Sequence, residues 1–167
     1  MNRRTFMELS SAGLAACAAA EAPMPMATLG KSGLRVSRFC LGGYHMAVKG
    51  DEAGVRIIHR AIDLGVNFFD SAHLYHKGRS DEVYGKALAG GLRKKVLLMS
   101  KAHERDRAGA MRQLEDTLRR MKTDYLDLWQ CHQISNHKEA DRLLAPGGSL
   151  EAFVEAKRQG KVRHIGF

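Results

Sequence analysis

The chain has 167 residues, enough for one domain with a hydrophobic core, and carries 27 Lys and Arg against 18 Asp and Glu, a net charge of +9. The basic residues are scattered among acidic ones along predicted helices, with no interleaved aromatic residues, which favours solvated helix faces over a nucleic-acid groove. A basic rim would also suit an anionic dinucleotide. The three cysteines form no CxxC pair, so neither a disulfide framework nor a zinc site is indicated.

Residues 1–22 differ in composition from the rest of the chain. Arg3 and Arg4 precede an uncharged stretch over 9–20 that is too short to span a bilayer as a helix. This pattern resembles a twin-arginine export signal, so we expect an exported, periplasmic protein. Cys17 ends a segment that resembles a lipoprotein processing box, and the signal or this lipid anchor would be the chain's contact with a membrane. The alternative is a disordered Ala-rich extension on a cytoplasmic protein.

From residue 28 onward, short apolar runs alternate with helical periodicity. A small β-hairpin is predicted over 28–37, where Gly30 and Gly33 lie between short apolar positions. Apolar residues recur at helical spacing over 51–64 until Gly65, which predicts a helix. The other elements expected in this half are a buried strand over 38–43, a strand over 66–72 and a helix over 80–88.

The second half of the chain repeats this alternation. Residues 96–102 form a continuous apolar run, which is typical of a strand buried on both faces of a parallel sheet. The helix that follows has an apolar face opposite its charged residues, formed by Met111, Leu114, Leu118 and Met121. The remaining expected elements are a strand over 126–132 with Trp129 in the core, an irregular stretch to 148, a helix over 149–157 and a strand beginning at 163.

Alternating strands and helices predict an α/β fold with right-handed parallel crossovers. The turn over 41–54 contains no GxGxxG motif, which argues against a dinucleotide-binding doubly wound sheet. Polar residues at strand ends favour a (β/α)8 TIM barrel, in which active sites collect at the carboxyl ends of the strands. We therefore predict a partial barrel over 28–167, with about five of the eight strands and an N-terminal β-hairpin, and expect the chain to be truncated at its C-terminus.

Four polar residues lie at or just after the ends of successive predicted strands: Asp70, Tyr75, Lys101 and His132. An acid, a phenol, an amine and an imidazole in one pocket can protonate a carbonyl oxygen while a cofactor supplies hydride. Each residue alone has a structural explanation as a turn cap, a loop aromatic, a surface cation or a hydrogen-bonded histidine. Their occurrence in order at strand ends favours a shared catalytic site.

Several motifs in this order resemble the aldo-keto reductase family. They are the run 67–72 followed by Tyr75, Gly78, Ser80, Glu82 and Gly85, then Ser100-Lys101, the run 118–128 leading to His132, and the run 160–167. The resemblance covers essentially everything after Ala27. It implies that Tyr75 is the general acid that protonates the carbonyl oxygen, and the base in the reverse direction. It also implies that Asp70 holds Lys101, whose ammonium favours the phenolate, and that His132 hydrogen-bonds the carbonyl oxygen.

The same resemblance implies a nicotinamide cofactor, NADP or NAD, near Gly43, Tyr44 and Asp70, and a small-molecule carbonyl substrate. It places most contacts to the dinucleotide phosphates in loops after later strands. A non-catalytic barrel subunit and an inactive fragment lacking most of the cofactor site remain alternatives. The histidines at 73, 76 and 137 lack the helical HxxxH spacing of a metal site, so we interpret them as loop residues.

Overall fold

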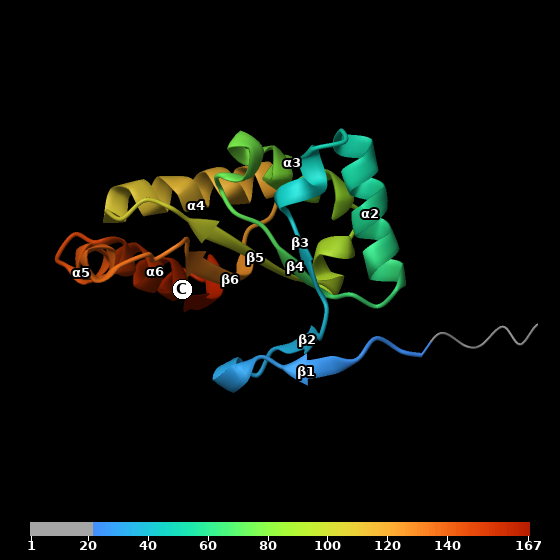
Figure 1. Ribbon diagram of the computed structural model, residues 1–167, viewed down its shortest axis with the longest axis horizontal. Helices are drawn as coiled ribbons and strands as arrows, with labels where there is room; N and C mark the ends of the chain where they lie inside the picture. Colours follow the sequence, from blue (N-terminus) through green and yellow to red (C-terminus); the bar gives the residue numbers. More distant parts are fainter. Residues whose placement is uncertain (1–21) are drawn as a thin grey trace, which may run out of the picture.

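The computed structural model describes residues 22–167, so the predicted export signal and its Cys17 lie outside the described residues except for position 22. Five strands form one parallel sheet in chain order. They are β3 (Cys40–Gly42), β4 (Phe68–Asp70), β5 (Leu97–Ala102), β6 (Leu126–Cys131) and β7 (Val162–Gly166). The antiparallel hairpin of β1 (Met26–Thr28) and β2 (Arg35–Ser37) precedes the sheet and stands apart from the helices (Figure 1). This architecture confirms the predicted partial barrel with its N-terminal hairpin.

Helices connect the strands and cover the outside of the curved sheet (Figure 1). They are α2 (Asp51–Asp63), α3 (Arg79–Ala87), α4 (Arg107–Met121), α5 (His137–Leu144) and α6 (Ser149–Arg158). Trp129 of β6 is 1% exposed and stacks on Phe153 of α6 with ring centroids 3.9 Å apart, which confirms its place in the core. Within the part of the chain that the structure covers, no helix has both the length and the apolar character needed to cross a bilayer.

Helix α5 lies where the sequence pattern indicated an irregular stretch. Its N-terminus carries a recognisable cap, because the Asn136 side chain accepts a hydrogen bond from the Glu139 backbone N–H at 3.0 Å. The Glu139 carboxylate in turn accepts from the Ser135 backbone N–H at 3.0 Å. This arrangement is similar to a capping box with asparagine as the first residue, except that Glu139 accepts from Ser135, the residue before the cap. The prediction was wrong because α5 is only eight residues long and only its Leu143 is buried, so it offers few apolar positions from which a helical period can be recognised.

The carboxyl ends of β3 and β4 are held close together by Tyr84 and Gly43. The buried Tyr84 hydroxyl lies 3.3 Å from the Leu41 carbonyl oxygen and 3.2 Å from that of Asp70, donating toward both. Burial raises the pKa of Tyr84 well above its usual value, so the hydroxyl stays protonated as a donor. A Cβ at Gly43 would lie 2.3 Å from the Asp70 carbonyl oxygen, so the close approach requires glycine. These contacts fix the backbone that carries Asp70.

Candidate active site

The four predicted catalytic residues lie at one edge of the sheet. Asp70 is the last residue of β4, Lys101 is near the end of β5, and His132 directly follows β6. Tyr75 begins a short 3-10 turn, Tyr75–Gly78, between β4 and α3. Because parallel strands in register end on the same side, these side chains can meet at the carboxyl edge.

Lys101 is at the centre of the cluster. Its ammonium Nζ donates to Oδ1 of Asp70, to the Ser71 carbonyl oxygen at 2.9 Å and toward the Tyr75 hydroxyl at 3.4 Å. These three partners match the three N–H donors of an ammonium group. The side chains of Lys101 and Asp70 are only 15% and 20% exposed, so water screens their ion pair less than a surface pair. The lysine is thereby held with its charge beside the phenol.

The carboxyl of Asp70 is in a partly buried environment. Burial raises the pKa of Asp70, and the hydrogen bond from Lys101 opposes this shift by favouring the carboxylate. The neighbouring thiol of Cys40 is also affected, because burial and then the charge of Asp70 raise the pKa of Cys40 to about 11. This shift favours the neutral thiol of Cys40 at neutral pH.

His132 completes the group on the other side of Tyr75. The two rings meet edge to face, with centroids 5.8 Å apart and an interplanar angle of 82°. Burial, followed by the charge of Lys101, lowers the pKa of His132, which favours the neutral imidazole at pH 7. Arg105 fixes the backbone at this point by donating to the His132 carbonyl oxygen at 2.7 Å. A neutral imidazole can donate one hydrogen bond to an oxygen at the rim.

Tyr44 forms the wall of the cluster on the β3 side. Its ring is half-exposed and lies edge to face on Tyr75 with centroids 5.3 Å apart, and tilted against His76 at 4.8 Å. Gly43 packs against the Asp70 backbone. The structure therefore brings both predicted cofactor-contacting positions, Gly43 and Tyr44, to the same rim as the predicted catalytic residues.

The turn that carries Tyr75 has an unusual backbone. His76 and Lys77 both adopt left-handed conformations, with φ of 48° and 57°, which non-glycine residues rarely do. Gly78 follows at φ 90°, with the Arg120 guanidinium packed where a Cβ would lie. Backbone strain of this kind is found at functional sites where the surrounding structure enforces it. No sequence pattern indicated this turn, since neither residue is glycine or asparagine.

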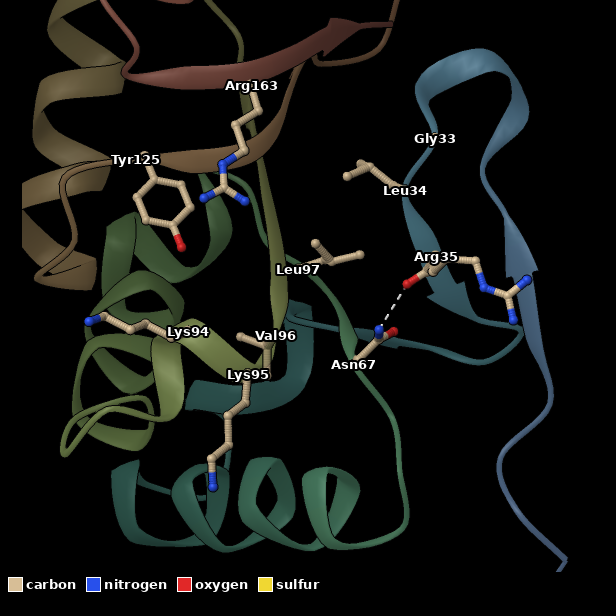
Figure 2. Close-up of a pocket in the computed structure, with 10 residues that line it drawn as sticks. All are labelled: Gly33, Leu34, Arg35, Asn67, Lys94, Lys95, Val96, Leu97, Tyr125 and Arg163. Atoms are coloured by element: carbon tan, nitrogen blue, oxygen red, sulfur yellow. Dashed lines mark hydrogen bonds between the residues drawn. The ribbon is translucent and has the colours of Figure 1, made fainter.

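A hollow of about 580 Å³ lies at the opposite end of the sheet, between the hairpin and the starts of the strands (Figure 2). Basic residues line it, but the side chains of Arg35, Lys94 and Lys95 point in different directions and do not converge (Figure 2). The Arg163 guanidinium lies over the Tyr125 ring at 4.2 Å. None of the four predicted catalytic residues lines this hollow, which separates it from the candidate site.

Asp81 of α3 carries a buried carboxyl behind the site, and its titration should make the stability of the protein depend on pH. Burial raises the pKa of Asp81 from 3.8 to about 6, opposed by hydrogen bonds from Ser71 and Thr117. Among the charged neighbours, Arg120 of α4 lowers this pKa and Glu82 of α3 raises it. Between pH 3.8 and about 6, the Asp81 carboxyl of the folded protein holds a proton that the unfolded chain has lost. The free energy of unfolding therefore decreases as pH rises through this range.

We expect Asp81→Asn to remove this decrease. The difference in unfolding free energy between the variant and the wild type should therefore grow in favour of the variant between pH 4 and 7. The increase is at most about 3 kcal/mol, as the linkage relation gives for a shift of this size. Urea denaturation across this range measures the difference, and other titrating groups cancel because both proteins contain them. A constant difference across the range would contradict the assignment.

Known proteins of similar sequence match most of the chain. The Aldo/keto reductase family model matches residues 38–167. The chain is 36% identical over 159 residues to the uncharacterized oxidoreductase YrpG of Bacillus subtilis (strain 168), covering 83% of this chain and 47% of that protein. It is 29% identical over 163 residues to the 6-dehydroglucose reductase of Novosphingobium aromaticivorans, covering 86% and 52%. The chain thus spans about half the length of these curated relatives.

Solved structures show the same relationship. The aldo-keto reductase AKR11C1 from Bacillus halodurans, in its holo form, superposes with a TM-score of 0.75 at 30% identity, covering 86% of this chain and 49% of that one. An aldo-keto reductase from Klebsiella pneumoniae in complex with NADPH superposes with a TM-score of 0.67 at 31% identity, covering 80% and 46%. The family match extends over most of the chain and includes all four predicted catalytic residues. The chain therefore belongs to the aldo/keto reductase family.

Proposed function

We propose that the protein reduces an aldehyde or ketone to an alcohol, or catalyses the reverse reaction, with NADPH or NADH as hydride donor and Tyr75 as general acid. The observation that carries this proposal is the position of the Lys101 ammonium, which contacts the Asp70 carboxylate and the Tyr75 hydroxyl together at the carboxyl edge of the sheet. Membership of an oxidoreductase family supports the reaction class.

The four residues at the carboxyl edge of the sheet each have a separate role in the proton transfer. Tyr75 donates its hydroxyl proton to the carbonyl oxygen as negative charge develops there. Lys101 stabilises the resulting phenolate, because an ammonium beside an anion lowers the energy of the charged form. Asp70 keeps the ammonium in place, and the neutral His132 ring donates a hydrogen bond to the same carbonyl oxygen. In the reverse direction Tyr75 accepts the proton from the alcohol.

The rim fits a nicotinamide group in two respects. The buried Nδ1 of His132 has no hydrogen-bond partner among the described residues, although buried polar atoms normally have one. Tyr44 presents a half-exposed aromatic ring beside Tyr75, suited to contact with a planar ring. Gly43, Tyr44 and Asp70 are the residues that we assign to hold the group. When bound, the cofactor supplies the hydride.

The test is consumption of NADPH by the chain in the presence of a carbonyl compound such as an aromatic aldehyde, followed by cofactor absorbance. We expect loss of the reduced cofactor only when protein and carbonyl compound are both present, and a parallel assay with NADH gives the cofactor preference. Binding of NADPH without turnover would favour the non-catalytic barrel subunit. Absence of both binding and turnover would favour the inactive fragment.

We also propose that the protein is exported through the twin-arginine route. Support comes from the Arg3 and Arg4 pair ahead of the uncharged stretch 9–20. A reporter fused after residue 27 should reach the periplasm, and changing both arginines to lysine should keep it in the cytoplasm. Labelling with a radioactive fatty acid, compared between the wild type and Cys17→Ser, tests the lipid anchor. A reporter that stays cytoplasmic with both arginines intact would contradict export.

A further inference from the structure

Asp81 lies in a buried hydrogen-bonded group that joins three elements behind the candidate site. Its side chain is fully buried. Oδ1 accepts a hydrogen bond from the Ser71 hydroxyl at 2.6 Å, and Oδ2 accepts one from the Thr117 hydroxyl at 3.0 Å. Ser71 directly follows β4, Asp81 belongs to α3 and Thr117 to α4. Each carboxylate oxygen thus anchors one neighbouring segment to α3.

The backbone of Ser71 contacts Lys101 directly. The Ser71 carbonyl oxygen accepts a hydrogen bond from Lys101 Nζ at 2.9 Å, and Ser71 is the chain neighbour of Asp70. Its backbone N–H donates to the Met99 carbonyl oxygen at 2.9 Å, which continues the pairing of the strands. Two of the three groups that hold the ammonium, the Asp70 carboxylate and the Ser71 carbonyl, are therefore on the segment that Asp81 anchors.

We propose that Asp81 is a positioning residue for the reaction, and that by holding the Ser71 hydroxyl it fixes the backbone which keeps the Lys101 ammonium against Tyr75. This inference rests on the proposed function, since it assigns a role toward a lysine that the proposed mechanism uses. The link to Thr117 has no such continuation, because Thr117 lies within α4 and its side chain bonds only to Asp81 among the described side-chain contacts. Loss of the Ser71 hydroxyl and loss of the Thr117 hydroxyl are therefore expected to affect Lys101 differently.

Burial of a polar group in this position has an energetic cost that apolar packing would avoid. A buried carboxyl loses its hydration, and two neutral hydroxyl donors offset that loss only in part. A side chain that served only to fill space between the strand and the two helices would be apolar. A hydrogen-bonded carboxyl instead specifies direction and distance for the Ser71 hydroxyl. A residue that positions Lys101 through Ser71 needs this fixed geometry.

Ser71→Ala and Thr117→Val are matched variants for the test. Each removes one buried hydroxyl that donates to Asp81, and each leaves the same carboxylate with one hydrogen bond fewer. We expect similar decreases in thermal stability for the two proteins. If the hydrogen bonds of Asp81 serve only stability, the two variants should also have the same effect on the chemical reactivity of the Lys101 amine. If Asp81 positions Lys101 through Ser71, only Ser71→Ala should change that reactivity.

The measurement is the rate at which trinitrobenzenesulfonate modifies Lys101 in the full chain, followed by peptide mass spectrometry. The exposed Lys94, at the other end of the sheet, provides the internal reference. We expect Ser71→Ala to speed the modification of Lys101 relative to Lys94 by about fivefold, the factor that loss of one net hydrogen bond gives. Thr117→Val should leave this ratio within about twofold. Equal effects of the two variants, or no effect of either, would overturn the inference.

Asp81→Leu, compared with Asp81→Asn, keeps the inference testable if Ser71→Ala does not fold. The asparagine Oδ1 can still accept from Ser71, while its amide donates to the Thr117 hydroxyl oxygen, whereas leucine removes both acceptors. We therefore expect the Lys101 rate of Asp81→Asn to match the wild type and that of Asp81→Leu to rise about fivefold. A wild-type rate in Asp81→Leu would overturn the inference. The modification needs neither cofactor nor substrate. Its result is therefore distinct from failure of the proposed function, which is shown by absence of NADPH turnover.

Discussion

Tyr75→Phe is expected to lower the rate of carbonyl reduction by about 10²–10⁴-fold, the usual contribution of a positioned general acid. Phenylalanine keeps the ring that packs against Tyr44 and His132 and removes only the hydroxyl. Without it, no side chain in contact with Lys101 among residues 22–167 can donate a proton to the carbonyl oxygen, since the other contacts are a carboxylate and a backbone carbonyl. NADPH consumption at saturating cofactor, with a single carbonyl substrate, measures the loss.

Tyr125→Phe is the matched control for this variant. Tyr125 lines the hollow at the opposite end of the sheet, where the Arg93 and Arg163 guanidinium groups lie over its ring, and no hydrogen bond joins its hydroxyl to Lys101 among the described contacts. We expect its turnover to stay within about threefold of the wild type, because the substitution keeps the ring and removes a hydroxyl that lies away from the candidate site. If both variants lose activity equally, or if Tyr75→Phe retains full turnover, the assignment of the acid is wrong.

Asp127→Ala is expected to lower the free energy of unfolding by about 3–5 kcal/mol, because the Arg93 guanidinium, whose side chain is 12% exposed, loses its carboxylate and the buried Leu98 backbone N–H loses its acceptor. Asp127 is 1% exposed. Its Oδ2 accepts from Arg93 Nη2 at 2.9 Å and from the Leu98 backbone N–H at 3.0 Å, and its Oδ1 accepts from Arg163 Nη1 at 2.9 Å. Both guanidinium groups also stack on the Tyr125 ring. The carboxylate thus ties together the starts of β5, β6 and β7.

Asp51→Ala provides the comparison, because Asp51 also binds two cations, Arg79 and Lys86, but at the surface. We expect that variant to lose about 1 kcal/mol or less, since exposed ion pairs contribute little. Urea denaturation of both proteins gives the two values, provided that the unfolding free energy falls with urea concentration at the same rate as in the wild type. Similar losses for the buried and the surface carboxylate would contradict the importance assigned to Asp127.

The strands, most of the helices and the residues of the candidate site could be inferred from sequence pattern. Continuous apolar runs such as 96–102 identify buried parallel strands, and parallel strands end at one edge, so Asp70, Lys101 and His132 were expected to meet. The structure places them there together with Tyr75. Helix α5 was missed, although the spacing of Asn136 and Glu139 contained a usable signal.

Other features depended on contacts between residues far apart in the chain, which local periodicity cannot report. The Ser71 and Asp81 pair, the approach of Gly43 to the Asp70 backbone and the left-handed turn at His76 arise only when β4, α3 and the β3 loop pack together. Whether a polar residue is a solvated surface group or a buried anchor depends on what its neighbours exclude from water. Periodicity thus identifies the elements and their order, whereas packing determines how firmly Lys101 is held beside Tyr75.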